Sequence, residues 1–181
     1  MASVSAQSDV SQSAPVPDSG ASADLVDRIL GEWAVAYPDL DVSPIGVLGR
    51  VSRIASLAAA RLDRNLEQFN LGRSEFDVLG ALVRSSRSLR ASEVVSTTML
   101  SGASVTKISE NLVRRGLIDR HKSERDGRVV LLAVTPAGRE LVEQVLPRRL
   151  ADDARLLVGL TSDDRDQLAR LLRKMSVSLP D

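Results

Sequence analysis

Apolar residues recur every three or four positions through most of the chain, which predicts a mainly helical fold. Near the start, Leu25, Ile29 and Trp33 are spaced by four. Pro38 disfavours helical geometry in the residue before it, so we expect a short amphipathic helix over residues 23–37.

A longer apolar period covers residues 44–70 and predicts a second helix that presents a seam to a neighbouring helix. Ser43 and Pro44 suit the N-cap and the first helical position. Gly72 suits a left-handed residue that ends this helix.

The next helix is expected to begin at Ser74, with Asp77 replacing the usual Glu of a capping box. Two short helices, 91–98 and 101–115, should follow, and Gly116 is placed to stop the second.

Two β-rich runs, 117–120 and 129–134, flank a polar segment that contains Asp126-Gly127, a dipeptide typical of hairpin turns. Thr135 and Thr161 are placed to cap two further amphipathic helices. The predicted fold class is mainly α with a small β-hairpin, arranged as a winged helix-turn-helix.

This pattern divides the chain into four expected parts. They are a disordered tail at 1–22, N-terminal helices at 23–70, a winged-helix lobe at 71–135, and C-terminal helices at 136–178.

Composition excludes several classes of protein. The sequence has no cysteine, which rules out disulfides, thiolate zinc sites and cysteine redox sensors, and its single histidine, His121, leaves little for a metal site. We expect no cofactor and no metal. The sequence has no membrane-spanning run and no secretory signal, so we expect a cytoplasmic protein.

Charge is concentrated in one segment, although the chain has 24 basic and 24 acidic residues. Residues 84–130 hold ten Lys or Arg and five Asp or Glu, a net charge of +5. The start of the predicted helix 101–115 is small and polar, which allows close approach to a major groove. The candidate DNA-binding residues on this helix are Ser101, Ala103, Ser104, Thr106, Lys107 and Arg114.

The hairpin tip is the second candidate DNA contact. Arg125 and Arg128 lie beside Asp126, and guanidinium groups suit phosphates and the negative minor groove. We expect Asp126 to orient one of these arginines.

Other functions were weighed against DNA binding. An enzyme is not expected, because the sequence has no cysteine, one histidine and no glycine-rich phosphate loop. The basic run could be an ordinary solvated face. The alternative function is a winged-helix module that binds another protein without reading DNA directly.

The run Leu100–Val142, with its "TPAG" at the start of a helix, resembles the recognition helix and wing of MarR-type regulators. The segments Asp24–Ala55 and Ser74–Ser85 are similar to the PecS and urate-responsive branch of that family, which has an extra first helix. This resemblance implies a homodimeric repressor whose terminal helices interlock into a helical dimerisation platform, and whose DNA binding is weakened by a small anion. It implies that residues 23–70 serve dimerisation and the ligand pocket, that 71–135 form the DNA-binding lobe, and that 136–178 hold further dimerisation helices.

The same resemblance implies a ligand site. Trp33 and Asp77 match the tryptophan and aspartate of that site, and Arg120 is the candidate basic partner, with Lys122 next. Ser85 matches a position where some members have a polar amide, and it departs from that pattern. The implied ligand is a small anion such as urate or a related purine or aromatic acid. Trp33 could instead be a core or interface residue, and Asp77 a helix-start acid.

These expectations define a mechanism. Asp77 would pair with Arg120 in the DNA-binding form, and an anion would take the arginine away. A symmetric dimer would place two recognition helices about 34–36 Å apart on a pseudopalindromic operator.

Overall fold

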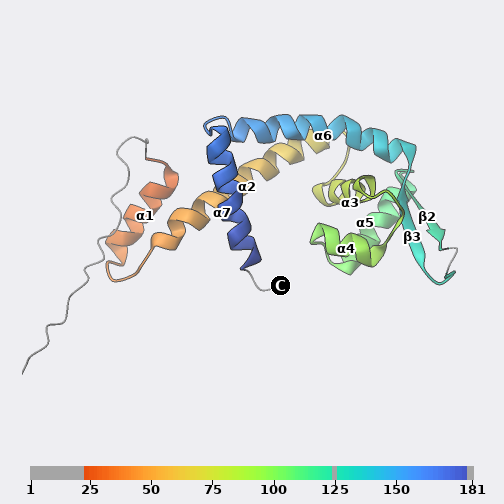
Figure 1. Ribbon diagram of the computed structural model, residues 1–181, viewed down its shortest axis with the longest axis horizontal. Helices are drawn as coiled ribbons and strands as arrows, with labels where there is room; N and C mark the ends of the chain where they lie inside the picture. Colours follow the sequence, from red (N-terminus) through yellow and green to blue (C-terminus); the bar gives the residue numbers. More distant parts are fainter. Residues whose placement is uncertain (1–22, 124–125, 179–181) are drawn as a thin grey trace, which may run out of the picture. The chain divides into compact units, whose positions relative to one another are not determined.

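The computed structural model describes residues 23–123 and 126–178, so the expected tail at 1–22 lies outside the described residues. The described part contains seven helices and three short strands (Figure 1). They are α1 (Leu25–Ala36), α2 (Ser43–Glu67), α3 (Arg73–Arg84), β1 (Leu89–Arg90), α4 (Ala91–Thr98), α5 (Gly102–Arg114), β2 (Ile118–Lys122), β3 (Val130–Val134), α6 (Pro136–Leu156) and α7 (Ser162–Val177). None of the helices described is long and apolar enough to cross a bilayer.

The chain divides into two compact units, Met1–Val51 and Ser52–Asp181. In the first unit, the Asp24 carboxylate caps α1 by accepting hydrogen bonds from the backbone N–H groups of Val26 and Asp27. Arg50 of α2 donates to both Asp24 and Asp27, and Val26 is buried. The hydrogen bond from Arg50 lowers the pKa of Asp27. These contacts attach α1 to the first turns of α2.

The second unit has its core where α3, α4 and α5 meet a three-stranded antiparallel sheet of order β1-β3-β2. The fully buried side chains come from every one of these helices and from the start of β2; they include Val78, Leu79, Leu82, Val94, Val105, Leu112 and Ile118. Figure 1 shows these elements gathered at the N-terminal end of α6. The predicted winged helix-turn-helix order is therefore confirmed.

The sheet has a strand that the sequence did not predict. Leu89 pairs with Leu132 of β3, and Arg90 pairs with Leu131, so β1 extends the expected hairpin to three strands. A strand of two residues is too short to show alternating polarity, and only the buried Leu89 side chain marks it. The wing strand β2 also runs to Lys122, two residues beyond its predicted end.

Three predicted helix ends were wrong. Ser43 is the first residue of α2 and not its cap, since its N–H donates to the Asp41 carboxylate. Asn70, with φ of 48°, is the left-handed residue after α2. Gly72 is instead the N-cap of α3, where its N–H donates to Glu75 Oε2 at 2.8 Å. The capping carboxylate is therefore Glu75 and not Asp77.

The predicted caps of α6 and α7 are confirmed. Thr135 Oγ1 accepts from the Gly138 N–H and donates to the carbonyl of Gly116 at 2.8 Å, with Pro136 at the first helical position. Thr161 caps α7 through the Asp164 N–H. Gly116, with φ of +67°, ends α5 as expected.

Candidate nucleic-acid interface

Helix α5 presents one face to the core and one to solvent. Val105, Ser109 and Leu112 are buried and hold the helix against α3, α4 and the sheet. The candidate contacts Ser101, Ala103, Thr106 and Lys107 are exposed, and Ser104 is half-buried. The structure therefore brings the predicted reading residues together on the open side of α5.

Hydroxyl groups stabilise the start of this helix. Ser101 Oγ accepts from the Ser104 N–H at 3.2 Å, and the two hydroxyls lie 2.9 Å apart. Thr106 Oγ1 donates to the carbonyl of Gly102 at 3.0 Å. These hydroxyls keep spare hydrogen-bonding capacity toward a ligand because each can accept further bonds.

Two cations lie along a shallow groove beside α5. Lys107 and Arg114 are exposed at its edge, and Leu100 and Ile108 provide its apolar surface. Glu75 also lines the groove, where its carboxylate is bonded to Asn111 and Arg115. Arg114 Nη2 donates to the Asn111 side chain at 3.1 Å, while Lys107 forms no ion pair among the described residues. A groove with a basic edge suits a phosphate backbone that passes the helix.

The wing is a hairpin whose turn is braced by Asp126. Its carboxylate accepts from the backbone N–H of Arg128 at 3.0 Å, and its carbonyl accepts from the Val129 N–H at 2.9 Å. Asp126 therefore fixes the backbone of the turn, and its expected pairing with a guanidinium group of the hairpin tip stays a prediction. Arg128 is exposed, and Arg125 lies outside the described residues.

The four predicted ligand residues fall on both units. Trp33 belongs to the first unit, where its ring is 45% exposed and lies 5.6 Å from the ring of Tyr37. Asp77, on α3, is half-buried. Ser85 ends α3, and its hydroxyl donates to the carbonyl of Arg87 at 2.7 Å.

Arg120 lies on β2 and lines a small cavity of about 40 Å³ together with Thr106 and Ser109. The expected Asp77–Arg120 ion pair is not among the ion pairs of the described residues. Instead, Arg120 is part of the contact between the reading helix and the sheet.

A polar cluster missed by the sequence reasoning joins α3 to α5. Glu75 accepts hydrogen bonds from Asn111 Nδ2 and from Arg115 Nη1, the latter at 3.4 Å. The three-residue spacing of Gly72 and Glu75 could have indicated the helix cap. The bonds from Glu75 to α5 join residues 36 and 40 positions apart, so no local sequence pattern indicates them.

Known proteins with a similar sequence or structure share this architecture. The sequence profile of the MarR family matches residues 69–129, which run from the end of α2 to the wing. BpsR from Bordetella bronchiseptica, whose DNA binding is regulated by 6-hydroxynicotinic acid, has a solved structure and is 30% identical in sequence to this chain. It aligns with a TM-score of 0.64 over 72% of this chain and 92% of that chain. This chain belongs to the MarR family of transcriptional regulators.

Two further relatives extend the comparison. The transcriptional regulator PecS of Dickeya dadantii is 28% identical over 156 residues, which cover 85% of this chain and 94% of PecS. MepR of Staphylococcus aureus in complex with DNA is 25% identical, with a TM-score of 0.67 over 78% of this chain and all of that chain. As a MarR-family member, this chain is a DNA-binding transcriptional regulator and not an enzyme.

Proposed function

We propose that this MarR-family regulator is a homodimeric repressor that a small organic anion releases from a pseudopalindromic operator. Helix α5 enters the major groove through its N-terminal face, and the wing lies against the neighbouring minor groove with Arg125 and Arg128. The ligand is urate, a related purine or an aromatic acid.

The observation that carries the DNA-binding mode is the open face of α5. Its first two turns expose only small or hydroxylic side chains and Lys107, so the helix can sit deep in a groove about 12 Å wide. Ser101, Ala103, Ser104 and Thr106 are the proposed contacts to base edges and sugars. Lys107 and Arg114 are the proposed contacts to phosphates and guanine.

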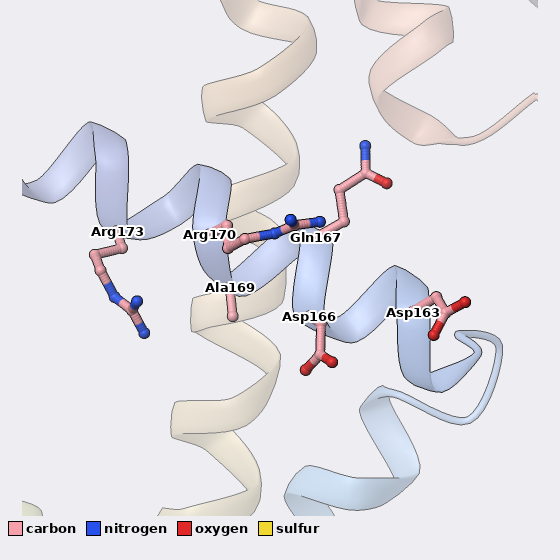
Figure 2. A pocket seen from close by; sticks show the side chains of 6 residues that line it. All are labelled: Asp163, Asp166, Gln167, Ala169, Arg170 and Arg173. Carbon is pink, nitrogen blue, oxygen red and sulfur yellow. The ribbon is translucent and has the colours of Figure 1, made fainter.

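Support for a homodimer comes from unpaired apolar surface in each unit. Helix α7 has no buried residue, yet Leu168, Leu171, Leu172 and Met175 step along one side of it. Figure 2 shows Asp166 and Arg173 pointing the same way, and helical spacing puts both on the side opposite these apolar residues. A two-faced helix with an uncovered apolar side is typical of a helix that packs against a partner subunit.

The ligand proposal rests on Trp33, Asp77, Ser85 and Arg120. Trp33 provides an exposed aromatic face for a planar ring, and Arg120 provides a positive charge for an anion. Because Asp77 and Arg120 form no ion pair, we propose that the anion binds Arg120 without first displacing Asp77. BpsR, whose DNA binding is regulated by an aromatic acid, supports this class of ligand.

A mobility-shift titration tests the proposal. The affinity for duplexes from the region upstream of this chain's own gene is first measured at several salt concentrations. If the protein contacts phosphates, the affinity should fall steeply as the salt concentration rises. Lys107→Ala should weaken operator binding by about tenfold, a loss in the range of a specific base or phosphate contact. Lys174→Ala, which removes the same charge from α7, should have little effect.

The ligand is tested in the same assay. Urate and 6-hydroxynicotinic acid should release the operator, and the neutral purine hypoxanthine should not. Trp33→Ala should lose the response while keeping the ligand-free affinity, and Val35→Ala on the same helix should keep both. Binding to a protein partner with no sequence-dependent DNA binding would support the alternative module instead.

A further inference from the structure

We infer that Glu75 and Arg115 form a strut that sets the orientation of the reading helix α5 relative to the α2–α3 junction. The inference uses the assignment of α5 as the reading helix and adds two residues that touch no DNA themselves. Both are positioning residues whose effect on DNA passes through α5.

The strut begins at the junction between α2 and α3. Arg115 Nη2 donates to the carbonyl of Phe69 at 3.1 Å, and Glu75 Oε2 accepts from the N–H of Gly72 at 2.8 Å. Both groups belong to the turn that ends α2. The positions of Arg115 and Glu75 are therefore tied to the backbone of this turn.

The strut ends on the last turn of α5. Asn111 Nδ2 donates to Glu75 Oε1, and Arg115 Nη1 donates to Glu75 Oε2 at 3.4 Å. One carboxylate thus receives bonds from the junction and from two positions on α5. The Glu75 and Arg115 side chains are only 15% and 28% exposed, so water screens this pair less than a surface pair.

The strut should affect function through the tilt of helix α5. A helix released at its C-terminal turn can tilt, and the tilt displaces its N-terminal turn, which here carries the proposed reading residues Ser101 to Lys107. Base reading requires accurate placement of these side chains, whereas general attraction to phosphates does not. Loss of the strut should therefore reduce discrimination between sequences more than it reduces overall attraction to DNA.

The chain contains a matched control pair on α4. Glu93 occupies the same place at the start of its helix, accepting from the Arg90 N–H at 2.7 Å and from Arg87 Nη2 at 2.5 Å. Both of these partners precede α4 and neither belongs to α5. Glu93→Gln removes the same helix-start charge and ion pair as Glu75→Gln, and Arg87→Gln removes the same ion pair as Arg115→Gln, without touching the strut.

The experiment compares Glu75→Gln and Arg115→Gln with these controls. Affinity is measured for the operator duplex and for a scrambled duplex of the same composition. Each strut variant should lower the operator-to-scrambled ratio by about tenfold, the scale of one hydrogen bond to a charged group. Each control should change the ratio less than twofold, and the double strut variant should cost no more than either single one.

Arg115→Gln separates positioning from folding, because it leaves the Gly72–Glu75 cap intact. Equal loss of affinity for both duplexes would overturn the inference, as would a similar ratio change in the controls. A salt dependence that becomes shallower by about one phosphate contact per subunit would instead make Arg115 a direct DNA contact.

Hydrogen exchange on the free full-length protein gives a readout that does not need an operator. Amides of residues 102–114 should lose protection in Arg115→Gln, and those of α4 should not. Unchanged protection of α5 would also overturn the inference. If the wild-type protein failed to discriminate the two duplexes, the proposed function would fail while this readout still tested the strut.

Discussion

Gly138 marks the closest approach between α6 and the reading lobe. A Cβ atom at this position would lie 2.1 Å from the carbonyl oxygen of Leu117 and 3.0 Å from the Leu117 carbonyl carbon. The oxygen also accepts from the N–H of Thr135 at 3.1 Å, so it has little freedom to move. The glycine of the "TPAG" run is therefore required for packing and not for a special backbone angle.

Replacement of this glycine tests the close approach. Gly138→Ala should lower the free energy of unfolding by about 2 kcal/mol, because overpacking forces the start of α6 away from Leu117. Gly31→Ala, inside α1 with no heavy atom near the added Cβ, should raise it by about 0.5–1 kcal/mol through helix propensity. Urea unfolding of both variants gives the comparison, and equal effects would contradict it.

Ser109 is the buried polar side chain without a hydrogen-bond partner among the described protein groups. Its hydroxyl lies on the small cavity beside Arg120. Ser109→Ala should raise the free energy of unfolding by about 1 kcal/mol, because it removes a desolvated donor. Ser96→Ala on α4 corrects for helix propensity, since its exposed hydroxyl is bonded to the Glu93 carbonyl. A loss of stability in Ser109→Ala would show that the hydroxyl is satisfied in solution.

Helix α4 depends on one carboxylate at its start. The hydrogen bond from Arg87, together with the backbone N–H of Arg90, lowers the pKa of Glu93 from 4.5 to about 2. A lowered pKa stabilises the folded state at every pH above the unfolded value of 4.5. This contribution then declines as the pH falls from 4.5 toward 2.

The pH dependence can be measured by thermal unfolding. Wild type should have a higher Tm than Glu93→Gln at pH 7, and the difference should vanish near pH 2. Glu32→Gln removes a carboxylate that makes no hydrogen bond among the described residues, so it should show no comparable change. A wild-type advantage that grew on acidification would contradict the assignment.

At the scale of the molecule, the question is what covers the apolar side of α7. Leu172 is 38% exposed in the single chain, and Figure 2 shows Ala169 pointing the same way as the charged Asp166. Leu172→Glu should convert the proposed dimer to monomer, because a buried charge without a partner is strongly unfavourable at an interface. Ala169→Glu adds the same charge on the side of Asp166 and should stay dimeric. Sedimentation velocity distinguishes the two results, and a dimeric Leu172→Glu protein would move the interface away from α7.

The same scale explains how a neutral protein can bind DNA. Basic and acidic residues balance over the whole chain, but the segment 84–130 carries the excess of positive charge, and the fold places that segment on α4, α5 and the wing. Local charge and not total charge therefore determines where a polyanion would dock.

The sequence alone determined the helices, the hairpin and the family resemblance. These features depend on short-range physics: apolar spacing of three or four, the Thr135 and Thr161 caps, and the turn at Asp126-Gly127 all operate within a few residues. The exposed face of α5 followed from the same periodicity. Errors occurred at helix ends, as when Gly72 was assigned to the end of α2 although it caps the start of α3.

Only the tertiary structure decided which distant residues meet. Strand β1 forms because Leu89 pairs with Leu132 of β3, which lies 43 residues later in the sequence. No local pattern indicates the bonds from Glu75 to α5 or the approach of Gly138 to Leu117. Nor does a local pattern show that Asp77 and Arg120 form no ion pair. Long-range contacts depend on how whole elements pack, so no spacing within one segment encodes them.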